Sequence, residues 1–313
     1  MGIFPFSVVE MLLYVVIVVL VVTLIRSIVL THKKQKGAMW RWCRGVLILA
    51  IVLFLFYILN CGINYKKESF AESSGIGTTE YTEDDLRQVC EWLTEQVNEW
   101  SGKVMRDEDG VMVVSEKNRT GDVPEDAVTA MQSLGKEYPE LSGFYPRPKP
   151  LLGSWILSIQ SLTGVYSPFT VEANYNNAMT DYNKPFTACH ELSHLKGFMQ
   201  EQEANFIAFL ACRESSEAEF QYSGNLSGWI YCMNVLHDVD YEAWEQVRSG
   251  LNSEVEADLQ ANREFWDKYD GTVAEVSNKV NDTYLKANGQ TDGVKSYDRM
   301  VDLVVAWWKE IYK

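Results

Sequence analysis

Two long apolar runs occupy the first part of the chain, and the remainder mixes apolar and polar positions. The run at 8–30 contains only Glu10 and Arg26 as charged residues, and the run at 45–63 contains none. Each run is long enough to cross a hydrocarbon core of about 30 Å as a helix. The first run is too long for a signal peptide and has no basic region before it. We therefore expect a transmembrane helical hairpin over residues 1–65, with spans at about 8–30 and 45–63.

The segment between the runs, 31–44, indicates the orientation of this hairpin. It contains five basic residues, Lys33, Lys34, Lys36, Arg41 and Arg44. Short loops rich in Lys and Arg stay in the cytoplasm. The expected arrangement is a two-span protein of the cell membrane with this loop inside. Residues 66–81 are small and polar and predict a linker to an extracytoplasmic domain at 82–313.

The periodicity of that domain is mainly helical. Leu86, Val89, Leu93 and Val97 recur at helical spacing after Thr82, which can cap the helix. A second helix should end before Pro139. Other segments are a loop or short hairpin at 106–124, one or two strands within 164–187, and helices at about 186–197, 201–214, 223–237, 240–268 with a break, and 296–312. The pattern predicts a mainly α fold with a small β element.

Composition narrows the classes of function. The formal charge is −15, yet residues 1–65 hold six basic residues against Glu10, so the acidic excess lies in the rest of the chain. An acidic domain argues against nucleic acid as a partner, because phosphate binding needs a basic face. The six cysteines are scattered without a CxxC pair. They predict buried free thiols, with one disulfide as the alternative, rather than a disulfide scaffold or a thiolate zinc site.

The sequence HELSH, His190–His194, carries the clearest chemistry. His190 and His194 are four residues apart, so both imidazoles project from one face of a helix. Both can reach one Zn²⁺ at about 2.0–2.1 Å. Glu191 can reach a water on that ion without occupying a ligand position. This HExxH arrangement is typical of metallopeptidases, in which the glutamate is the general base.

A catalytic zinc ion usually has a third protein ligand and one open position. Gly197 can end the motif helix, and a second helix can begin near Glu201. The residues from Glu201 fit the pattern E-x-x-[AS]-[DN], in which the carboxylate binds the metal and the last residue orients a histidine ring. Glu201 is the expected third ligand, with Glu203 as the alternative, and Asn205 is the expected orienting residue.

The stretch HELSHLKGFMQEQEANF resembles a bacterial family of two-pass membrane proteins that is catalogued as a domain of unknown function and taken to be zinc metallopeptidases. The resemblance extends to FQYSGNLSGWIYCMN and YLKANGQTDGVKSYDRMVDL. It implies a zincin-like α+β metallopeptidase domain of the gluzincin type. The interval from His194 to Glu201 is shorter than the usual gluzincin spacing and requires a very tight turn. The metzincin pattern fails at Gln200, where its third histidine belongs.

We therefore expect a membrane-anchored zinc metallopeptidase that hydrolyses peptide bonds of a peptide or protein substrate outside the cytoplasm. Because the resemblance covers their segments, four residues are candidates for oxyanion or substrate contacts: Tyr222, Tyr284, Tyr297 and Lys286. Two other interpretations stay open. One is a catalytically inactive zinc-binding membrane receptor or scaffold, and the other is a membrane protein without a metal.

Overall fold

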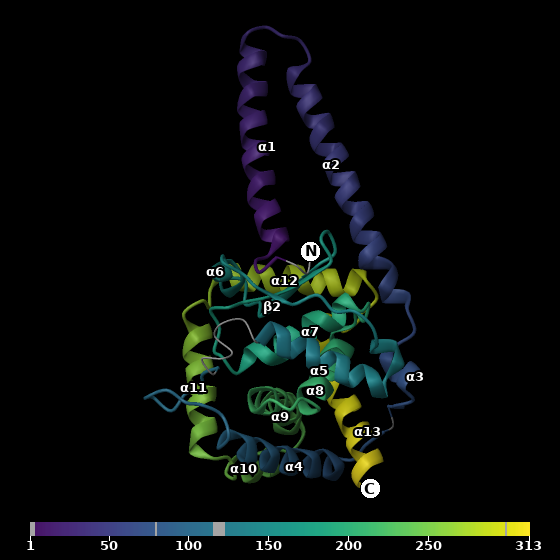
Figure 1. The fold of residues 1–313 in the computed structure, drawn as a ribbon, viewed down its shortest axis with the longest axis vertical. Helices are drawn as coiled ribbons and strands as arrows, with labels where there is room; N and C mark the ends of the chain where they lie inside the picture. The colour runs from purple at the N-terminus through teal and green to yellow at the C-terminus, as the bar shows by residue number, and fades with distance from the viewer. Residues whose placement is uncertain (1–3, 79, 115–122, 298) are drawn as a thin grey trace.

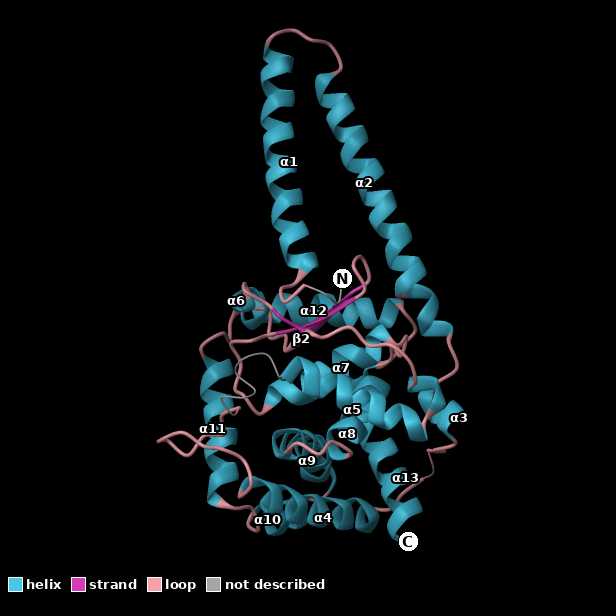
Figure 2. Cartoon of the chain, in the orientation of Figure 1, coloured by secondary structure: helices cyan, strands magenta, loops and turns pink. Residues whose placement is uncertain are grey.

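The computed structural model describes residues 4–78, 80–114, 123–297 and 299–313. It consists of a long helical hairpin and a body from which both helices of the hairpin emerge on one side (Figure 1). Figure 2 shows that helices dominate the body and that its small sheet lies on the side next to the hairpin. The expected mainly helical fold is confirmed.

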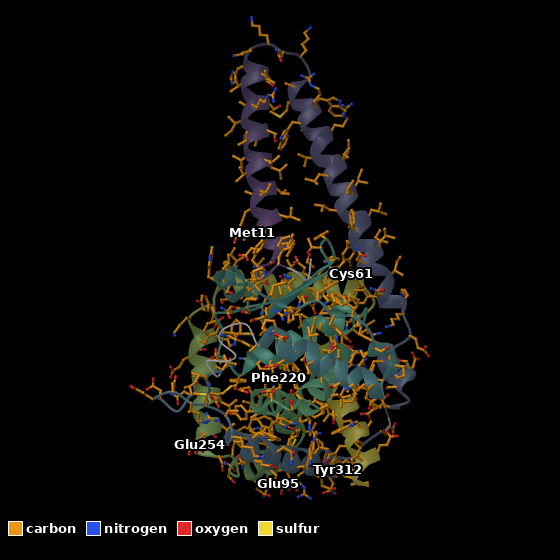
Figure 3. All side chains as sticks on the ribbon, in the orientation of Figure 1. Met11, Cys61, Glu95, Phe220, Glu254 and Tyr312 are labelled. Atoms are coloured by element: carbon orange, nitrogen blue, oxygen red, sulfur yellow. The ribbon has the colours of Figure 1, made fainter. Side chains whose placement is uncertain are left out.

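The hairpin consists of α1 (Val8–His32) and α2 (Ala38–Asn60). Both are long and apolar enough to cross a membrane, and Figure 3 shows their side chains, nearly all carbon, projecting away from the hairpin. α2 begins seven residues before the expected span at 45–63. Gly37 has φ +81°, and this left-handed conformation lets the chain reverse directly into α2. The connection is therefore short, and Arg41 and Arg44 lie on the helix.

The body is built around two buried helices, α8 (Glu201–Arg213) and α9 (Ala218–Val239). α7 (Asn183–Leu195) packs against both of them, and α4 (Glu83–Ser101) packs against α9. As expected, Thr82 caps α4 through a capping box. The remaining helices are α3 (Phe70–Ser74), α5 (Val123–Glu137), α6 (Ser154–Ser158), α10 (Tyr241–Arg248), α11 (Ser253–Asp267), α12 (Thr272–Ala287) and α13 (Met300–Tyr312), with short 3-10 helices η1 (Gly62–Lys66), η3 (Pro139–Leu141) and η4 (Gly293–Tyr297).

The sheet has three short strands in the order β1-β3-β2. β2 (Gly164–Ser167) and β3 (Glu172–Tyr175) lie in the segment where one or two strands were expected, and they pair antiparallel. β1 (Lys149–Pro150) joins β3 in parallel from the proline-rich segment. The order leaves β2 as an edge strand whose outer side has no partner strand in the described parts of the chain.

Two segments differ from expectation. The expected linker at 66–81 contains α3, and Phe70 within it is fully buried in the core. Residues 272–287, for which the periodicity gave no prediction, form α12. The expected loop or short hairpin at 106–124 contains one antiparallel bridge, between Arg106 and Met112, and 115–122 lie outside the described residues.

All six cysteines are free, as expected. Five of them are buried, and Cys43, on the outer surface of α2, is exposed. No disulfide therefore contributes to the stability of this fold.

Candidate metal centre

A tight turn between α7 and α8 brings the candidate ligands together. α7 ends at Leu195, and the N–H of Gly197 donates to the His194 carbonyl while the N–H of Phe198 donates to the Ser193 carbonyl, at 2.9 and 3.2 Å. These two bonds form a Schellman motif, which requires a left-handed residue. Gly197 supplies it with φ +91°. The chain then enters α8 at Glu201 after only five residues, as the short spacing required.

Three ligand atoms converge at this turn. His190 Nε2 lies 3.2 Å and His194 Nε2 lies 3.6 Å from Glu201 Oε2. Two ligands that each lie about 2.0–2.1 Å from a tetrahedral zinc ion are about 3.3 Å apart. Glu201 Oε2 is buried and makes no hydrogen bond to any described residue. His190, His194 and Glu201 could therefore hold a metal ion, and two imidazoles with one carboxylate are a donor set that suits zinc.

Hydrogen bonds from the surrounding chain orient the imidazoles. His194 Nδ1 lies 2.8 Å from the carbonyl oxygen of Phe198. A carbonyl only accepts, so Nδ1 carries a proton and Nε2 is the ring nitrogen that faces Glu201. The Asn205 side chain contacts the His190 ring and favours its protonated form, and its Nδ2 donates to the Tyr231 hydroxyl at 3.2 Å. Asn205 thus lies beside the ring that it was expected to orient.

Two buried carboxylates make this site favourable for a cation. Burial lowers the pKa of His190. Burial opposes protonation of His194 as well, but Glu201 and Glu191 outweigh it and raise the pKa of His194 to about 9. Burial would raise the pKa of Glu201, yet the two imidazoles hold that pKa well below its usual range. Glu201 is therefore ionised, which is the form that binds metals.

Glu191 lies beside this cluster without belonging to it. Its Oε2 is buried and has no hydrogen-bond partner among the described residues. Burial raises the pKa of Glu191 to about 8, against the opposing effect of His194. β2 covers this carboxylate at Gly164, where an added Cβ would clash with Glu191 Oε1. A carboxylate held near neutral pKa in a closed setting is suited to accept and release a proton.

The cluster lies in a cavity of about 720 Å³. Its walls come from α2, β2, α7, α8, α9, α12 and the turns beside them. Tyr284 and Tyr297, both expected near the site, line it. Burial raises the pKa of Tyr297 well above its usual value, and the nearby Glu201 adds to this shift. Tyr297 is thus a neutral hydroxyl donor close to the cluster.

Three other candidates lie elsewhere. Glu203 points away from the cluster and accepts the backbone N–H of Phe70 at 2.7 Å, so it anchors α3. The Tyr222 hydroxyl donates to Asp258 in the core, away from the cavity. Lys286 pairs with Asp282 at 2.7 Å on the surface of α12.

The cavity is also lined by residues that the sequence motifs do not single out. Tyr231 lies on α9 nine positions after Tyr222, which is about half a revolution further around a helix of 3.6 residues per turn, and it lines the cavity. Tyr57 of α2, Cys61 directly after α2 and Tyr65 of η1 line it as well. Helical phase places Tyr222 and Tyr231 on opposite faces of α9, but the sequence does not show which face meets the site. No local signal pointed to the hairpin residues.

Comparison with known proteins gives one result. A family model with the description "Protein of unknown function (DUF3810)" matches residues 1–305. No curated protein and no solved structure matches the chain. Since the match covers almost the whole sequence, the chain belongs to the DUF3810 family.

Proposed function

We propose that this protein is a membrane-anchored zinc metallopeptidase with a zincin-like domain that hydrolyses peptide bonds on the extracytoplasmic side. The observation that carries the proposal is the spacing of His190, His194 and Glu201 around a buried carboxylate oxygen without a hydrogen bond. Three protein ligands are the number typical of catalytic zinc, whereas structural zinc usually has four.

In this proposal the chain's own residues handle the proton and the substrate. Zinc bound by the three residues would supply Lewis-acid activation of water and of the scissile carbonyl. Glu191 removes a proton from the attacking water and then delivers it to the nitrogen of the leaving amine, so the carboxylate is regenerated. Tyr297 is the proposed hydroxyl donor to the developing oxyanion, because it is neutral and near both Glu201 and Glu191.

The edge strand β2 provides a way to hold a peptide. It lines the cavity with Gly164, Val165 and Tyr166 and has one unpaired side. An extended substrate adds to such an edge through main-chain hydrogen bonds. This arrangement would place the scissile bond beside Glu191, which Gly164 covers.

The membrane topology is part of the proposal. α1 and α2 are the two spans, and the basic residues near their connection favour the cytoplasmic side for the tip of the hairpin. The body is then extracytoplasmic.

Metal content and peptide hydrolysis of the purified full-length chain test the proposal. We expect about one zinc per chain and cleavage of a peptide library. Glu191→Gln should keep the zinc and lose about 10²–10⁴-fold in kcat, while His190→Ala should lose both zinc and hydrolysis.

Glu201→Gln and Glu203→Gln form a matched pair two residues apart on α8. Only the Glu201 variant should lose zinc affinity, because Glu203 contacts the Phe70 backbone instead. Full activity of Glu191→Gln would exclude the proposed mechanism. If the wild type binds one zinc but hydrolyses no peptide, this result would favour the alternative function, a catalytically inactive zinc-binding membrane receptor or scaffold.

A further inference from the structure

The wall of the metal cavity includes the last turn of the apolar hairpin. Tyr57 of α2 and Cys61, the residue that follows α2, line the cavity. The Tyr57 hydroxyl donates to Asn288 Oδ1 at 2.8 Å, and Cys61 Sγ lies 3.3 Å from the Tyr284 hydroxyl. The end of α2 is therefore bonded directly to the elements around the site.

The turn between β2 and β3 is attached to the same end of α2. Asn60 Nδ2 donates to the carbonyl oxygen of Pro168 at 2.9 Å. The Tyr166 hydroxyl donates to the carbonyl oxygen of Asn60 at 3.2 Å. Tyr166 belongs to the edge strand β2, which lines the cavity. These hydrogen bonds therefore fix the position of β2 relative to the end of the hairpin.

α1 is fixed to the same side of the body. The Glu172 carboxylate of β3 accepts the N–H groups of Val8 and Val9, at 3.2 and 2.9 Å. Glu10 of α1 in turn accepts the N–H groups of Leu152 and Gly153, at 3.0 and 2.6 Å. Both helices thus leave the body from one face, as Figure 1 shows.

This face carries exposed apolar side chains next to each point of attachment. On α12, Val273, Val276, Val280 and Tyr284 follow one stripe at helical spacing. Tyr284 contacts Tyr57 of α2 with its ring, whereas the three valines are exposed, Val280 by 63%. The stripe therefore continues from the hairpin contact along the surface.

Two further groups complete the surface that we call the membrane-side patch. Phe169 and Val171 are exposed in the β2–β3 turn, and Val171 has φ +53°, which is strained for a β-branched residue. Leu152 and Trp155 are exposed at α6, beside the bonds to Glu10. The membrane-side patch consists of Leu152, Trp155, Phe169, Val171, Val273, Val276 and Val280.

The occupant that fits this patch is the lipid bilayer. A helix of 23 residues such as α2 extends about 35 Å at 1.5 Å per residue, a little more than the hydrocarbon core of about 30 Å. When the tip of the hairpin lies on the opposite side of the bilayer from the body, the near boundary of the bilayer falls at the last turn of α2. At this turn Tyr57 and Asn60 meet the cavity wall. Exposed aromatic and aliphatic residues at that level would lie in the membrane interface.

Taking the proposed peptidase activity and membrane topology as the basis, we propose that the substrate is a polypeptide anchored in the same bilayer and cleaved close to its anchor. The membrane-side patch holds the body against the lipid surface, and the cavity accepts the chain at that surface. Exposed apolar residues at the cavity itself, Val165, Phe169 and Val294, favour such a segment over a freely soluble peptide.

The contact with lipid is tested without reference to activity. The full chain with Cys43→Ser, which removes the exposed thiol, receives Phe169→Cys or Val276→Cys and a polarity-sensitive fluorophore. Glu95→Cys is the control, because Glu95 is exposed on α4 at the far end of the body (Figure 3). In nanodiscs with spin-labelled lipid, the labels at 169 and 276 should lose fluorescence and the label at 95 should not. Equal quenching at all three sites, or none at 169 and 276, would overturn the inference.

Substrate class is tested with the full chain in liposomes, body outward. One random peptide pool is supplied lipid-free and with a palmitoyl anchor through spacers of about 5 or about 25 residues, which reach at most about 17 Å or about 85 Å. The short-spacer pool should be cut at least as fast as the long-spacer pool and faster than the lipid-free pool. Suppose that the long-spacer or the lipid-free pool is cut while the short-spacer pool stays intact. This result would overturn the substrate assignment and leave the proposed peptidase function standing. If no pool is cut, the proposed peptidase function fails and this substrate assignment fails with it.

Discussion

Gly164 controls how closely β2 approaches the candidate general base. A Cβ at this position would clash with Glu191 Oε1 and would lie 2.8 Å from Thr187 Cγ2. We expect Gly164→Ala to displace the carboxylate, to lower kcat at least tenfold and to cost about 1–3 kcal/mol of unfolding free energy, as overpacking does. Zinc content should be unchanged, because Gly164 does not contact the ligands.

Peptide hydrolysis and zinc analysis of the same preparation provide the measurement. Gly77→Ala is the control, since an added Cβ there meets nothing within 4 Å. Wild-type kcat in Gly164→Ala would show that the position of Glu191 is not critical.

At the level of single residues, the sequence could identify what depends on helical spacing. His190, His194 and Glu201 are brought together by one helix turn and one Schellman motif, both local. Glu203 could not be distinguished from Glu201, because its partner, the Phe70 backbone, is 133 positions away. Tyr222 could not be distinguished from Tyr231, because the sequence does not fix which face of α9 meets the site.

Between elements, Asp85 links the first turn of α4 to α13. Its carboxylate accepts from Lys313 Nζ at 2.6 Å, from Lys309 Nζ at 3.2 Å and from the Thr82 N–H at 2.9 Å. These bonds, with Lys313 contributing most, hold the pKa of Asp85 well below its usual value of 3.8. The stabilisation is therefore fully present above about pH 4 and is lost as pH falls through the lower pKa of the folded state.

We expect Asp85→Asn to lower the unfolding free energy at pH 7 by about 1–2 kcal/mol. The difference from the wild type should shrink as pH falls below 4, because the carboxyl then takes up a proton in the unfolded chain while it is still ionised in the folded one. Thermal unfolding of the detergent-solubilised chain, at pH 7 and below pH 4, measures this difference. Asp84→Asn should change little, because Asp84 pairs only with exposed side chains of its own helix. A deficit of Asp85→Asn that is the same at both pH values would contradict this electrostatic origin.

Helices with a buried face were predictable, and other elements were less so. α4 and α7 follow from their apolar spacing and caps. α12 buries only Ala274 and Leu285, so its pattern lacks an inward face, although Val273, Val276 and Val280 do keep helical spacing. β1 has two residues and exists through its pairing with β3, a tertiary contact that no local pattern encodes.

In the whole molecule, the division into hairpin and body was predictable, but the contacts between hairpin and body were not. Apolar length alone indicates two spans. The cavity wall, however, includes Tyr57, whose hydroxyl is bonded to Asn288 across 231 positions of sequence. Contacts of that range depend on how the body packs, so the sequence could not show that the hairpin forms part of the candidate site.

The attachment of α1 to the body gives a last prediction. Glu172 caps the first turn of α1 and lies 3.8 Å from Lys149 Nζ, with both side chains almost fully buried. Breaking one partner of a buried ion pair leaves an uncompensated charge and costs about 3–5 kcal/mol. We expect the loss of unfolding free energy in Glu172→Gln to lie toward the lower end of that range, because the amide oxygen can still accept one N–H of α1.

Thermal unfolding in detergent measures this loss, and limited proteolysis reports whether the start of α1 is released. The double variant Lys149→Met, Glu172→Gln should recover part of the stability, because it also removes the buried charge of Lys149. Glu275→Gln on the exposed surface of α12 is the matched control for the loss of one carboxylate. If Glu172→Gln unfolds at the temperature of the wild type and keeps α1 protected, the hairpin is held to the body by its remaining contacts, those of Glu10 and of the end of α2.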